Sequence, residues 1–374
     1  MTEWKTYKLG DVCSRLRSGK GIPSSEVSTC GKYAVVGGNG VRGYTDKSNF
    51  NGQCVVVGRQ GAYCGNVRYF DGEFYMTEHA VVIVGNEYAD THFLAYLLST
   101  MHLGQLSAQS AQPGLSVQTL SKLEISLPPL EEQMRIAGIL SAIDDKIENN
   151  RRINNNLEQQ AQALYKQWFV DNCKEDWEEK PLSEIVFFQE GPGIRNWQYV
   201  EKKGVRFINI RCINDGDVNV QNANMISEDE ACGKYAHFLL EPLDIVMSCS
   251  GTLGRYAIIR QEHLPLCLNT SVIRFKPAQC IEDYSFVYGY LSSAEFLNKQ
   301  EEMACGSVQA NFGPTHLKQI KIKVPPKDYR MKYNNVVMPI INMMLKNRSE
   351  INMLSSLRDT LLPKLMNGKM KWYI

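Results

Sequence analysis

The residues whose types and spacing suggest catalysis are few in this sequence, and none completes a catalytic set. Glu178-Glu179-Lys180 and Glu201-Lys202-Lys203 form E-x-K triplets, a pattern found where nucleases hold a divalent cation that activates water. Neither triplet has a convincing upstream aspartate on a predicted strand. His79 and His316 are single histidines, for which core or surface roles are expected rather than catalysis.

Other reaction classes lack their motifs as well. The chain contains no G-x-x-x-x-G-K-[ST] phosphate loop. Gly38 and Gly43 have the spacing of its two glycines, but Tyr44 and Thr45 follow them, so that a tyrosine stands in place of the lysine. No N-P-P-[YF] or D-P-P-[YF] sequence, which marks amino-methyltransferases, is present. The 11 cysteines are scattered singly, without a C-x-x-C pair or a Cys/His cluster at zinc spacing. We therefore expect no catalytic centre, no metal site and reduced thiols, which are typical of the cytoplasm.

Composition sets wider limits. A chain of 374 residues with 44% hydrophobic and 22% charged residues is typical of a globular protein with two or three domains. Residues 1–10 lack the apolar core of a signal peptide, and no run of about 18 apolar residues occurs, so we expect neither secretion nor a membrane span. The formal net charge of +1 alone argues only weakly against a nucleic-acid binder, and the distribution of charge along the chain contains no basic stripe able to clamp phosphates unaided.

The main organisational feature is an internal repeat. Trp4 and Leu9-Gly10-Asp11-Val12 recur as Trp177 and Leu182-Ser183-Glu184-Ile185, 173 residues later. Each copy also closes alike, since Leu120, Ile125 and Pro128-Pro129 correspond at an offset of 197 to Leu317, Ile322 and Pro325-Pro326. The chain is therefore expected to contain two related domains.

Inside each copy, short β-branched and aromatic runs alternate with glycine, which predicts a compact, strand-rich domain with exposed loops. The expected strands are residues 33–36, 80–84, 205–210 and 271–275. Short helices are expected near 93–101 and 284–297, which makes each domain mixed rather than all-β.

After each double proline the period changes to the 4-3 spacing of a heptad repeat. In the first copy the stripe consists of Ile136, Leu140, Ile143, Ile147, Asn150, Asn154, Leu157, Ala161, Leu164 and Trp168. The same offset of 197 gives Tyr333, Val337, Ile340, Met344, Asn347, Ile351, Leu354, Arg358, Leu361 and Leu365. At about 1.5 Å per residue, a helix over 131–170 is roughly 60 Å long. We expect the two long helices to bury their stripes against each other.

Asn150 and Asn347 fall at equivalent positions near the middle of these helices. In an antiparallel pair they are expected to meet and to specify the register, although a solvated break in the seam is the alternative. Pro339 and Pro363 lie within the second helix, where they are expected to kink it or to move its start to Pro339.

Two strand-rich domains alternating with two paired long helices resemble the specificity subunit of type I restriction–modification enzymes. The resemblance covers essentially the whole chain, and several local phrases carry it. These phrases are Gly38-Asn39-Gly40-Val41-Arg42-Gly43-Tyr44, Leu127-Pro128-Pro129-Leu130-Glu131-Glu132-Gln133 before Ile136-Ala137, the group Tyr165, Trp168 and Phe169, and Leu357-Arg358-Asp359 before Leu361-Leu362-Pro363-Lys364-Leu365 and Gly368. The second copy has Asp328-Tyr329-Arg330 in place of Glu131-Glu132-Gln133, so a partner contact there is expected to be weaker or differently built.

The resemblance implies an α+β fold in which two pseudo-symmetric target-recognition domains are separated by two long helices forming an antiparallel coiled coil. The domains would be residues 1–129 and 173–326, and the helices 130–172 and 327–374. It also implies a non-catalytic subunit that binds a bipartite, gapped site in double-stranded DNA. Partner methyltransferase subunits, two of them by the family pattern, would methylate adenine with S-adenosylmethionine. Separate restriction subunits would use ATP and Mg²⁺ to translocate and cut DNA.

Candidate DNA-binding residues are the polar and cationic side chains on glycine-rich loops, where the backbone can approach a groove closely. In the first domain these are Arg15, Arg17, Lys20, Asn39, Arg42, Arg59, Gln60 and Tyr63. In the second domain they are Arg195, Tyr199, Asn209, Arg211, Ser250, Thr252 and Arg255. Arginine pairs well with guanine, and asparagine or glutamine with adenine; the alternative is that many of these residues lie in ordinary solvated turns.

Two other functions stay open at this point. The chain could be an enzyme, against which the missing catalytic motifs argue. It could also be a coiled-coil scaffold, or an orphan or degenerate specificity subunit, which would confer no sequence selectivity on any DNA-bound complex.

The spacer hypothesis makes one prediction that needs no structure. Inserting one whole heptad at matching levels into both helices should lengthen the gap in the DNA target, because each insertion preserves the apolar stripe. Both half-sites should stay unchanged when the methylated motif is mapped. A change in the bases at either end would contradict the spacer role.

Overall fold

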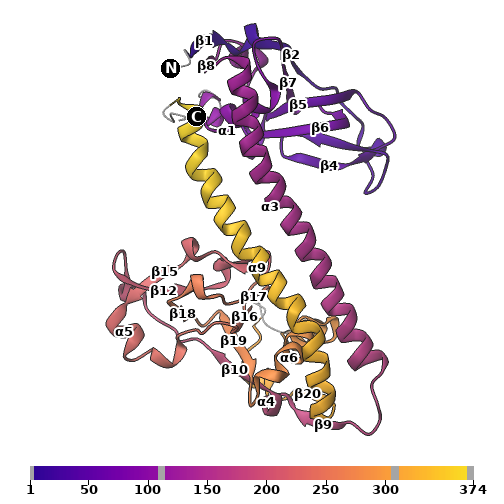
Figure 1. The fold of residues 1–374 in the computed structure, drawn as a ribbon, viewed down its shortest axis with the longest axis vertical. Helices are drawn as coiled ribbons and strands as arrows, with labels where there is room; N and C mark the ends of the chain where they lie inside the picture. Colours follow the sequence, from indigo (N-terminus) through magenta and orange to yellow (C-terminus); the bar gives the residue numbers. More distant parts are fainter. Residues whose placement is uncertain (1–3, 108–113, 305–310, 369–374) are drawn as a thin grey trace. The chain divides into compact units, whose positions relative to one another are not determined.

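A computed structural model describes residues 4–107, 114–304 and 311–368 of the chain. Contacts divide the chain into two compact units, Met1–Glu148 with Asn352–Ile374, and Asn149–Ile351. Each unit contains one copy of the repeat together with a part of both long helices (Figure 1). The fold is α+β, as predicted. The last six residues of the predicted C-terminal helix lie outside the described ranges.

The first unit is built around a six-stranded sheet with the order β2-β7-β5-β6-β3-β4. Its strands are β2 Cys13–Ser18, β3 Tyr33–Gly37, β4 Gly40–Thr45, β5 Phe50–Gly58, β6 Val67–Met76 and β7 Ala80–Gly85. Helix α1 (Thr91–Ser99) packs its buried Phe93 and Leu94 in the same core as Val55, Val57 and Ile83. Burial of these apolar side chains supplies the main driving force for folding of this unit.

The second unit has two four-stranded sheets, with the orders β10-β19-β16-β17 and β11-β15-β12-β18. The first sheet comprises β10 Val186–Glu190, β16 Ile245–Ser248, β17 Tyr256–Ile258 and β19 Val272–Pro277. The second comprises β11 Tyr199–Val200, β12 Gly204–Ile208, β15 Asn224–Ser227 and β18 Leu266–Leu268. Along the chain, the hairpin of β13 (Ile213–Asn214) and β14 (Asp217–Val218) comes between β12 and β15, and helix α5 (Glu228–Cys232) follows β15. The order β10-β19-β16-β17 repeats the order β2-β7-β5-β6 of the first unit, so the repeat preserves one framework.

The ends of each copy are joined in the same way. In the first unit, β1 (Lys5–Lys8) pairs antiparallel with β8 (Glu124–Leu127), just after the short helix α2 (Val117–Ser121). In the second, β9 (Glu178–Pro181) pairs antiparallel with β20 (Lys321–Val324), with α4 (Leu182–Ile185) and α8 (Pro314–Leu317) beside them. The backbone N–H of Leu9 donates to Leu123, and that of Leu182 donates to Ile320, which is the equivalent residue. The repeated sequence therefore closes each domain immediately before a long helix begins.

One predicted helix is two helices. The segment predicted as one helix near 284–297 forms α6 (Tyr284–Leu291) and α7 (Ala294–Ala304). The break follows from Ser293, whose hydroxyl accepts a hydrogen bond from the N–H of Phe296 at 3.2 Å and so caps a new helix. Apolar periodicity continues across the break, which is why it did not reveal the cap.

The long helices are α3 (Leu130–Tyr165), continued by a π-helical turn at Lys166–Asp171, and α9 (Lys327–Met366). Within each unit they run in opposite directions, and every residue of the two predicted stripes is buried or half-buried. In the first unit, Arg358 of α9 pairs with Asp144 of α3 at 2.9 Å. In the second, Phe169 lies edge-to-face against Tyr333, with ring centroids 4.6 Å apart. The predicted stripes are confirmed.

The predicted meeting of Asn150 with Asn347 is wrong by about one helical turn. The side-chain amide of Asn347 donates to Asn154 at 2.9 Å, and that of Asn154 donates to the carbonyl of Met344 at 3.1 Å. Asn150 donates instead to Glu350 at 2.8 Å. The heptad pattern specifies which face of each helix is buried, but it does not specify the level at which antiparallel helices align.

The alternative that the second helix begins at Pro339 does not hold, because α9 begins at Lys327 and runs through both prolines. Pro339 and Pro363 lie on the exposed side of the helix, where water can reach the carbonyls that lose their helical partner. Tyr333, Val337, Ile341 and Met344 on the opposite side are fully buried in the core of the second unit. This burial holds α9 helical on both sides of Pro339.

Gln133 and Arg330, equivalent residues in the repeat, fasten the helix starts to their domains with different chemistry. Gln133 is fully buried, and its amide donates to the carbonyl of Pro128 at 2.8 Å and accepts from the N–H of Asp90 at 2.9 Å. Arg330 donates to the carbonyl of Pro325 at 2.6 Å and to both oxygens of Asp283. Asp90 and Asp283 stand at the starts of α1 and α6. Arg330 therefore contacts its own domain, as Gln133 does, and an ion pair with Asp283 takes the place of the neutral amide contacts of Gln133.

This difference leads to a stability prediction. Arg330→Ala leaves the buried Asp283 carboxylate without its cation, so the free energy of unfolding should fall by about 3 kcal/mol. The double variant Arg330→Ala/Asp283→Asn should regain part of that loss, because no charge is then left buried. Urea unfolding measures both effects. Lys332→Ala on the exposed side of α9 is the control and should change stability by less than about 0.5 kcal/mol; a single variant as stable as this control would contradict the prediction.

Candidate nucleic-acid interface

In the first unit, glycines bring three loops together at one end of the sheet. A Cβ on Gly38, between β3 and β4, would lie 3.0 Å from the Cα of Gly58 and 3.0 Å from the carbonyl oxygen of His79. Gly58 ends β5, and His79 precedes β7. A side chain at this position would be tightly crowded, so the absence of one on Gly38 favours the close approach. The N–H of Arg59 also donates to His79 at 3.0 Å, which joins the β5–β6 loop to the turn before β7.

The segment after β2 reaches the same loops. The N–H of Gly19 donates to Ala80 at 3.1 Å, and that of Lys20 donates to Met76 at 2.9 Å. Of the eight predicted residues in this domain, the loop cluster therefore includes five. They are Lys20, Asn39, Arg59, Gln60 and Tyr63.

The other three predicted residues of this domain lie on strands. Arg17 is exposed on β2, and Arg42 is exposed on β4 with its stem beside Gly37. Arg15 is half-buried, with its guanidinium 4.9 Å from the centre of the Phe50 ring. Burial and the nearby charge of Arg17 lower the pKa of Arg15. Arg15 therefore packs against its own sheet and is the least available of the three.

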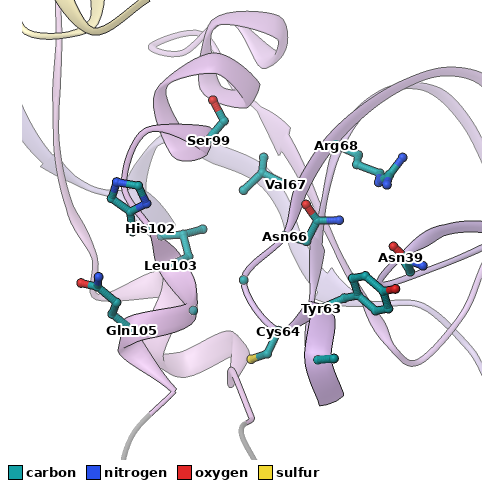
Figure 2. A pocket seen from close by; sticks show the side chains of 13 residues that line it. Asn39, Tyr63, Cys64, Asn66, Val67, Arg68, Ser99, His102, Leu103 and Gln105 are labelled. Atoms are coloured by element: carbon teal, nitrogen blue, oxygen red, sulfur yellow. The ribbon is translucent and has the colours of Figure 1, made fainter. Parts of the chain in front are cut away.

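An open hollow of about 680 Å³ lies next to the loop cluster (Figure 2). One wall comes from the β5–β6 loop and the β3–β4 turn, and the other from the segment that follows α1. Its polar lining side chains are Asn39, Tyr63, Asn66, Arg68, Ser99, His102 and Gln105. None of the 13 lining residues is an aspartate or a glutamate. The hollow therefore offers hydrogen-bond donors and a cation without an opposing carboxylate.

Sequence reasoning missed several residues of this hollow. Asn66 and Arg68 follow Gly65 at the start of β6, and the glycine-rich loop was a usable signal for them. His102 and Gln105 come from a segment about 40 residues later in the chain, and no local pattern links them to that loop. Only the fold brings the two segments together.

In the second unit, loops that follow β12 and β16 come together. The N–H of Asn269 donates to Ile208 at 3.1 Å, and that of Cys249 donates to Ser271 at 3.0 Å. A Cβ on Gly251 would lie 3.4 Å from Cδ1 of Ile210. These contacts place five predicted residues on adjacent loops, namely Asn209, Arg211, Ser250, Thr252 and Arg255.

The hydroxyl of Ser248 stabilises the loop between β16 and β17. The hydroxyl of Ser248 donates to the carbonyl of Thr252 at 2.7 Å and accepts from the N–H of Arg255 at 3.0 Å. The side chains of Thr252 and Arg255 are exposed. Asn209, in contrast, uses its side-chain oxygen to accept from the N–H of Arg211, so that oxygen is already engaged.

Arg195 lies on a separate turn between Gly193 and β11, and Tyr199 is the first residue of β11. Gln198 anchors this turn, since its amide donates to Glu230 at 2.7 Å and accepts from the N–H of Arg195 at 2.9 Å. Tyr199 packs against the buried Phe207, with ring centroids 6.3 Å apart. Trp197 on the same turn is 77% exposed and was missed as a candidate. Arg195, Asn196 and Trp197 are exposed to solvent on this turn.

The described residues include no cluster of three His, Cys, Asp or Glu side chains able to hold a metal ion. No helix among them is long and apolar enough to cross a membrane. Burial raises the pKa of the Cys54 and Cys249 thiols to about 12, so both stay protonated and are poor nucleophiles. His316 accepts a hydrogen bond from the N–H of Gly313 at 3.1 Å, which is a capping role.

The chain is similar to known proteins along most of its length. The family model described as type I restriction modification DNA specificity domain matches residues 1–159 and 174–336. The type I restriction enzyme EcoprrI specificity subunit of Escherichia coli is 38% identical over 146 residues, which are 38% of this chain and 36% of that protein. The MjaIX specificity subunit of Methanocaldococcus jannaschii is 26% identical over 304 residues, or 75% of this chain and 69% of that protein.

A solved structure agrees at the level of the fold. The type I restriction–modification S subunit from M. genitalium matches with a TM-score of 0.69 and 22% identity, over 98% of this chain and 96% of that one. Both copies of the repeat are matched by the same family model, in agreement with the duplicated framework. The chain belongs to the type I restriction–modification DNA specificity domain family.

Proposed function

We propose that this chain is the specificity subunit of a type I restriction–modification complex, which binds a bipartite DNA site and directs the adenine methylation and restriction carried out by its partners. The observation that carries the proposal is the duplicated framework, which in each copy presents polar side chains on loops held by glycine contacts. The chain itself is non-catalytic and acts in the cytoplasm. S-adenosylmethionine, ATP and Mg²⁺ belong to partner subunits.

In this proposal, residues 1–129 and 173–326 are the two target-recognition domains, and the helices of 130–172 and 327–374 set the gap between the half-sites. Two recognition domains that bind a duplex from the same side contact half-sites about 34–36 Å apart, which is one helical turn of DNA. The loop clusters differ between the copies, since the second contains the added β13–β14 hairpin and α5. Different loops on one framework support two unlike half-sites.

Two methyltransferase subunits fit the internal repeat of the helices. Met134 on α3 and Met331 on α9 are equivalent positions, and both are exposed, by 59% and 38%. Methionine is a flexible apolar side chain that suits protein interfaces. The same exposed residue type at equivalent places supports two copies of one partner, each bound near the start of a long helix. Beside Met134, Glu132 and Arg135 form an ion pair at 2.7 Å. The equivalent residues beside Met331 are Tyr329 and Lys332, so the two partner contacts would be alike but not identical.

A scaffold, or a degenerate specificity subunit, is the alternative. Both would bind the partner through the helices and would confer no sequence selectivity. Exposed Gln60 and Thr252 on the loop clusters favour recognition over scaffolding, because amide and hydroxyl groups on loops can reach base edges.

A methylation map tests the function directly. DNA from cells that express this chain with its methyltransferase partner should carry a methylated motif of two short blocks with a fixed gap. DNA from cells with the partner alone should not. Gln60→Ala should relax one block and Thr252→Ala the other, since each lost base contact costs about 1–3 kcal/mol. A stable complex that leaves no such motif would favour the scaffold.

The partner sites make a separate prediction about stoichiometry. Met134→Lys and Met331→Lys each place a charge in an apolar contact, so each should remove one methyltransferase subunit and the double variant both. Mass photometry of the purified complex measures this as a change from two partners to one and then to none. Gln162→Lys adds the same charge at an exposed position of α3 and should keep both partners. Retention of two partners by both single variants would exclude these positions.

A further inference from the structure

We propose that the hollow of the first unit, lined by Asn39, Tyr63, Asn66, Arg68, His102 and Gln105, binds a phosphate group of the DNA backbone. This inference rests on the proposed role in DNA recognition and adds to it a division of labour. The hollow would anchor the duplex, and the neighbouring loop residues would read its bases. Phosphate contacts position a protein on DNA, whereas base contacts supply sequence specificity.

Arg68 supplies the cationic side chain of the site. Its guanidinium lies against Gly40, so that a Cβ there would be 3.3 Å from one terminal nitrogen and 3.4 Å from Cζ. Gly40 has a φ of 97°, a conformation that favours glycine, and the missing side chain leaves room for the guanidinium. Arg68 is exposed and lies at the edge of the hollow (Figure 2). It has no hydrogen-bond or ion-pair partner among the described residues, so its guanidinium is available to a ligand. The planar guanidinium carries a fork of hydrogen-bond donors that matches the geometry of a phosphate.

The opposite wall holds His102 in an unusual backbone conformation. His102 has a φ of 48°, in the left-handed region that non-glycine residues rarely adopt. Such conformations persist where the surrounding structure imposes them, and they concentrate at functional sites. The wall is imposed by close backbone contact, because a Cβ on Gly65 would lie only 2.1 Å from the nitrogen of Gly104. The conformation places the imidazole in the lining of the hollow, on the wall opposite Arg68 (Figure 2).

The remaining lining groups favour an anion. Asn39, Asn66 and Gln105 carry amides, and Tyr63 carries a hydroxyl, all of which can donate hydrogen bonds. No carboxylate lines the hollow to repel a phosphate or to neutralise Arg68. Among ligands present at a DNA interface, the backbone phosphate combines a negative charge with several acceptor oxygens.

The concave shape separates a phosphate site from a base-reading site. Base edges lie on the floor of a groove, so a protein reads them with side chains that project outward. Phosphates line the ridges beside the groove and can enter a hollow on the protein surface. Lys20 and Gln60 are exposed on the adjacent loops and are the projecting groups. The hollow therefore suits a phosphate of the DNA backbone, while the side chains on the loops suit base edges in the groove.

The test uses the complex of this chain with its methyltransferase partner and two duplexes, one carrying the mapped motif and one unrelated. Arg68→Ala should weaken binding to both by the same factor, about tenfold, because a charged hydrogen bond to phosphate is lost regardless of sequence. The slope of log affinity against log salt should become shallower by about 0.9, the value for one released phosphate contact. Arg68→Lys should keep the slope, and Lys122→Ala, an exposed cation outside the hollow, should change neither affinity nor slope.

Single neutral methylphosphonates along the duplex locate the contact. At one position the substitution should weaken the wild-type complex but not the Arg68→Ala complex, and the methylated motif should stay the same in both. A change of bases in one half of the motif would make Arg68 a base reader and overturn the proposal, as would an unchanged affinity and slope. If the wild-type complex binds both duplexes equally, the recognition function fails, while the salt slope on either duplex still decides the phosphate site.

Discussion

The rest of the structure depends on the burial of one apolar stripe on each long helix. The largest apolar core of each domain includes residues of these helices. Ile136, Leu140 and Leu365 belong to the core of the first unit, and Ala161, Val337 and Met344 to that of the second. Burying a large aliphatic side chain stabilises a fold by about 1.5–3 kcal/mol, so the helix residues contribute substantially to each core. The helices are therefore structural members of both domains rather than connections between them.

Polar residues in the seam have a different role from the apolar ones. Asn154 and Asn347 are buried and hydrogen-bonded to each other, and a shift of either helix along the other would break this hydrogen bond. Apolar side chains alone would tolerate such a shift at lower cost, because burial is not directional. The asparagines thus select one alignment of the helices from several that the apolar stripe permits. A device that sets a distance between two half-sites needs such a selection.

The sequence alone was sufficient for the features that repeat. The duplication and the two stripes were predicted because offsets of 173 and 197 residues and a 4-3 heptad spacing can be counted along the chain. The strand-rich character of both domains was predicted from short β-branched and aromatic runs that alternate with glycine. The level of the helix pairing was predicted wrongly, since Asn154 and Asn150 occupy adjacent positions of the same stripe and only the opposing helix distinguishes them. The hollow was missed because His102 and Arg68 are joined by the fold and by no local pattern. Ser293 was read as part of one continuous helix, although its capping hydroxyl ends one helix and begins the next.

The glycine contacts at the loop end of the first unit have a consequence for evolution. Gly58 and Gly65 each touch backbone closely enough to exclude a side chain, so substitution there would displace a loop, and Gly38 also lies in tight backbone contact. Residues between them, such as Asn39 and Gln60, are exposed and make few internal contacts. Mutational tolerance is therefore uneven on the scale of single residues, with intolerant positions beside permissive ones. A lineage can change the permissive side chains one at a time while the intolerant glycines keep the loops in place, which makes new targets accessible without a new fold.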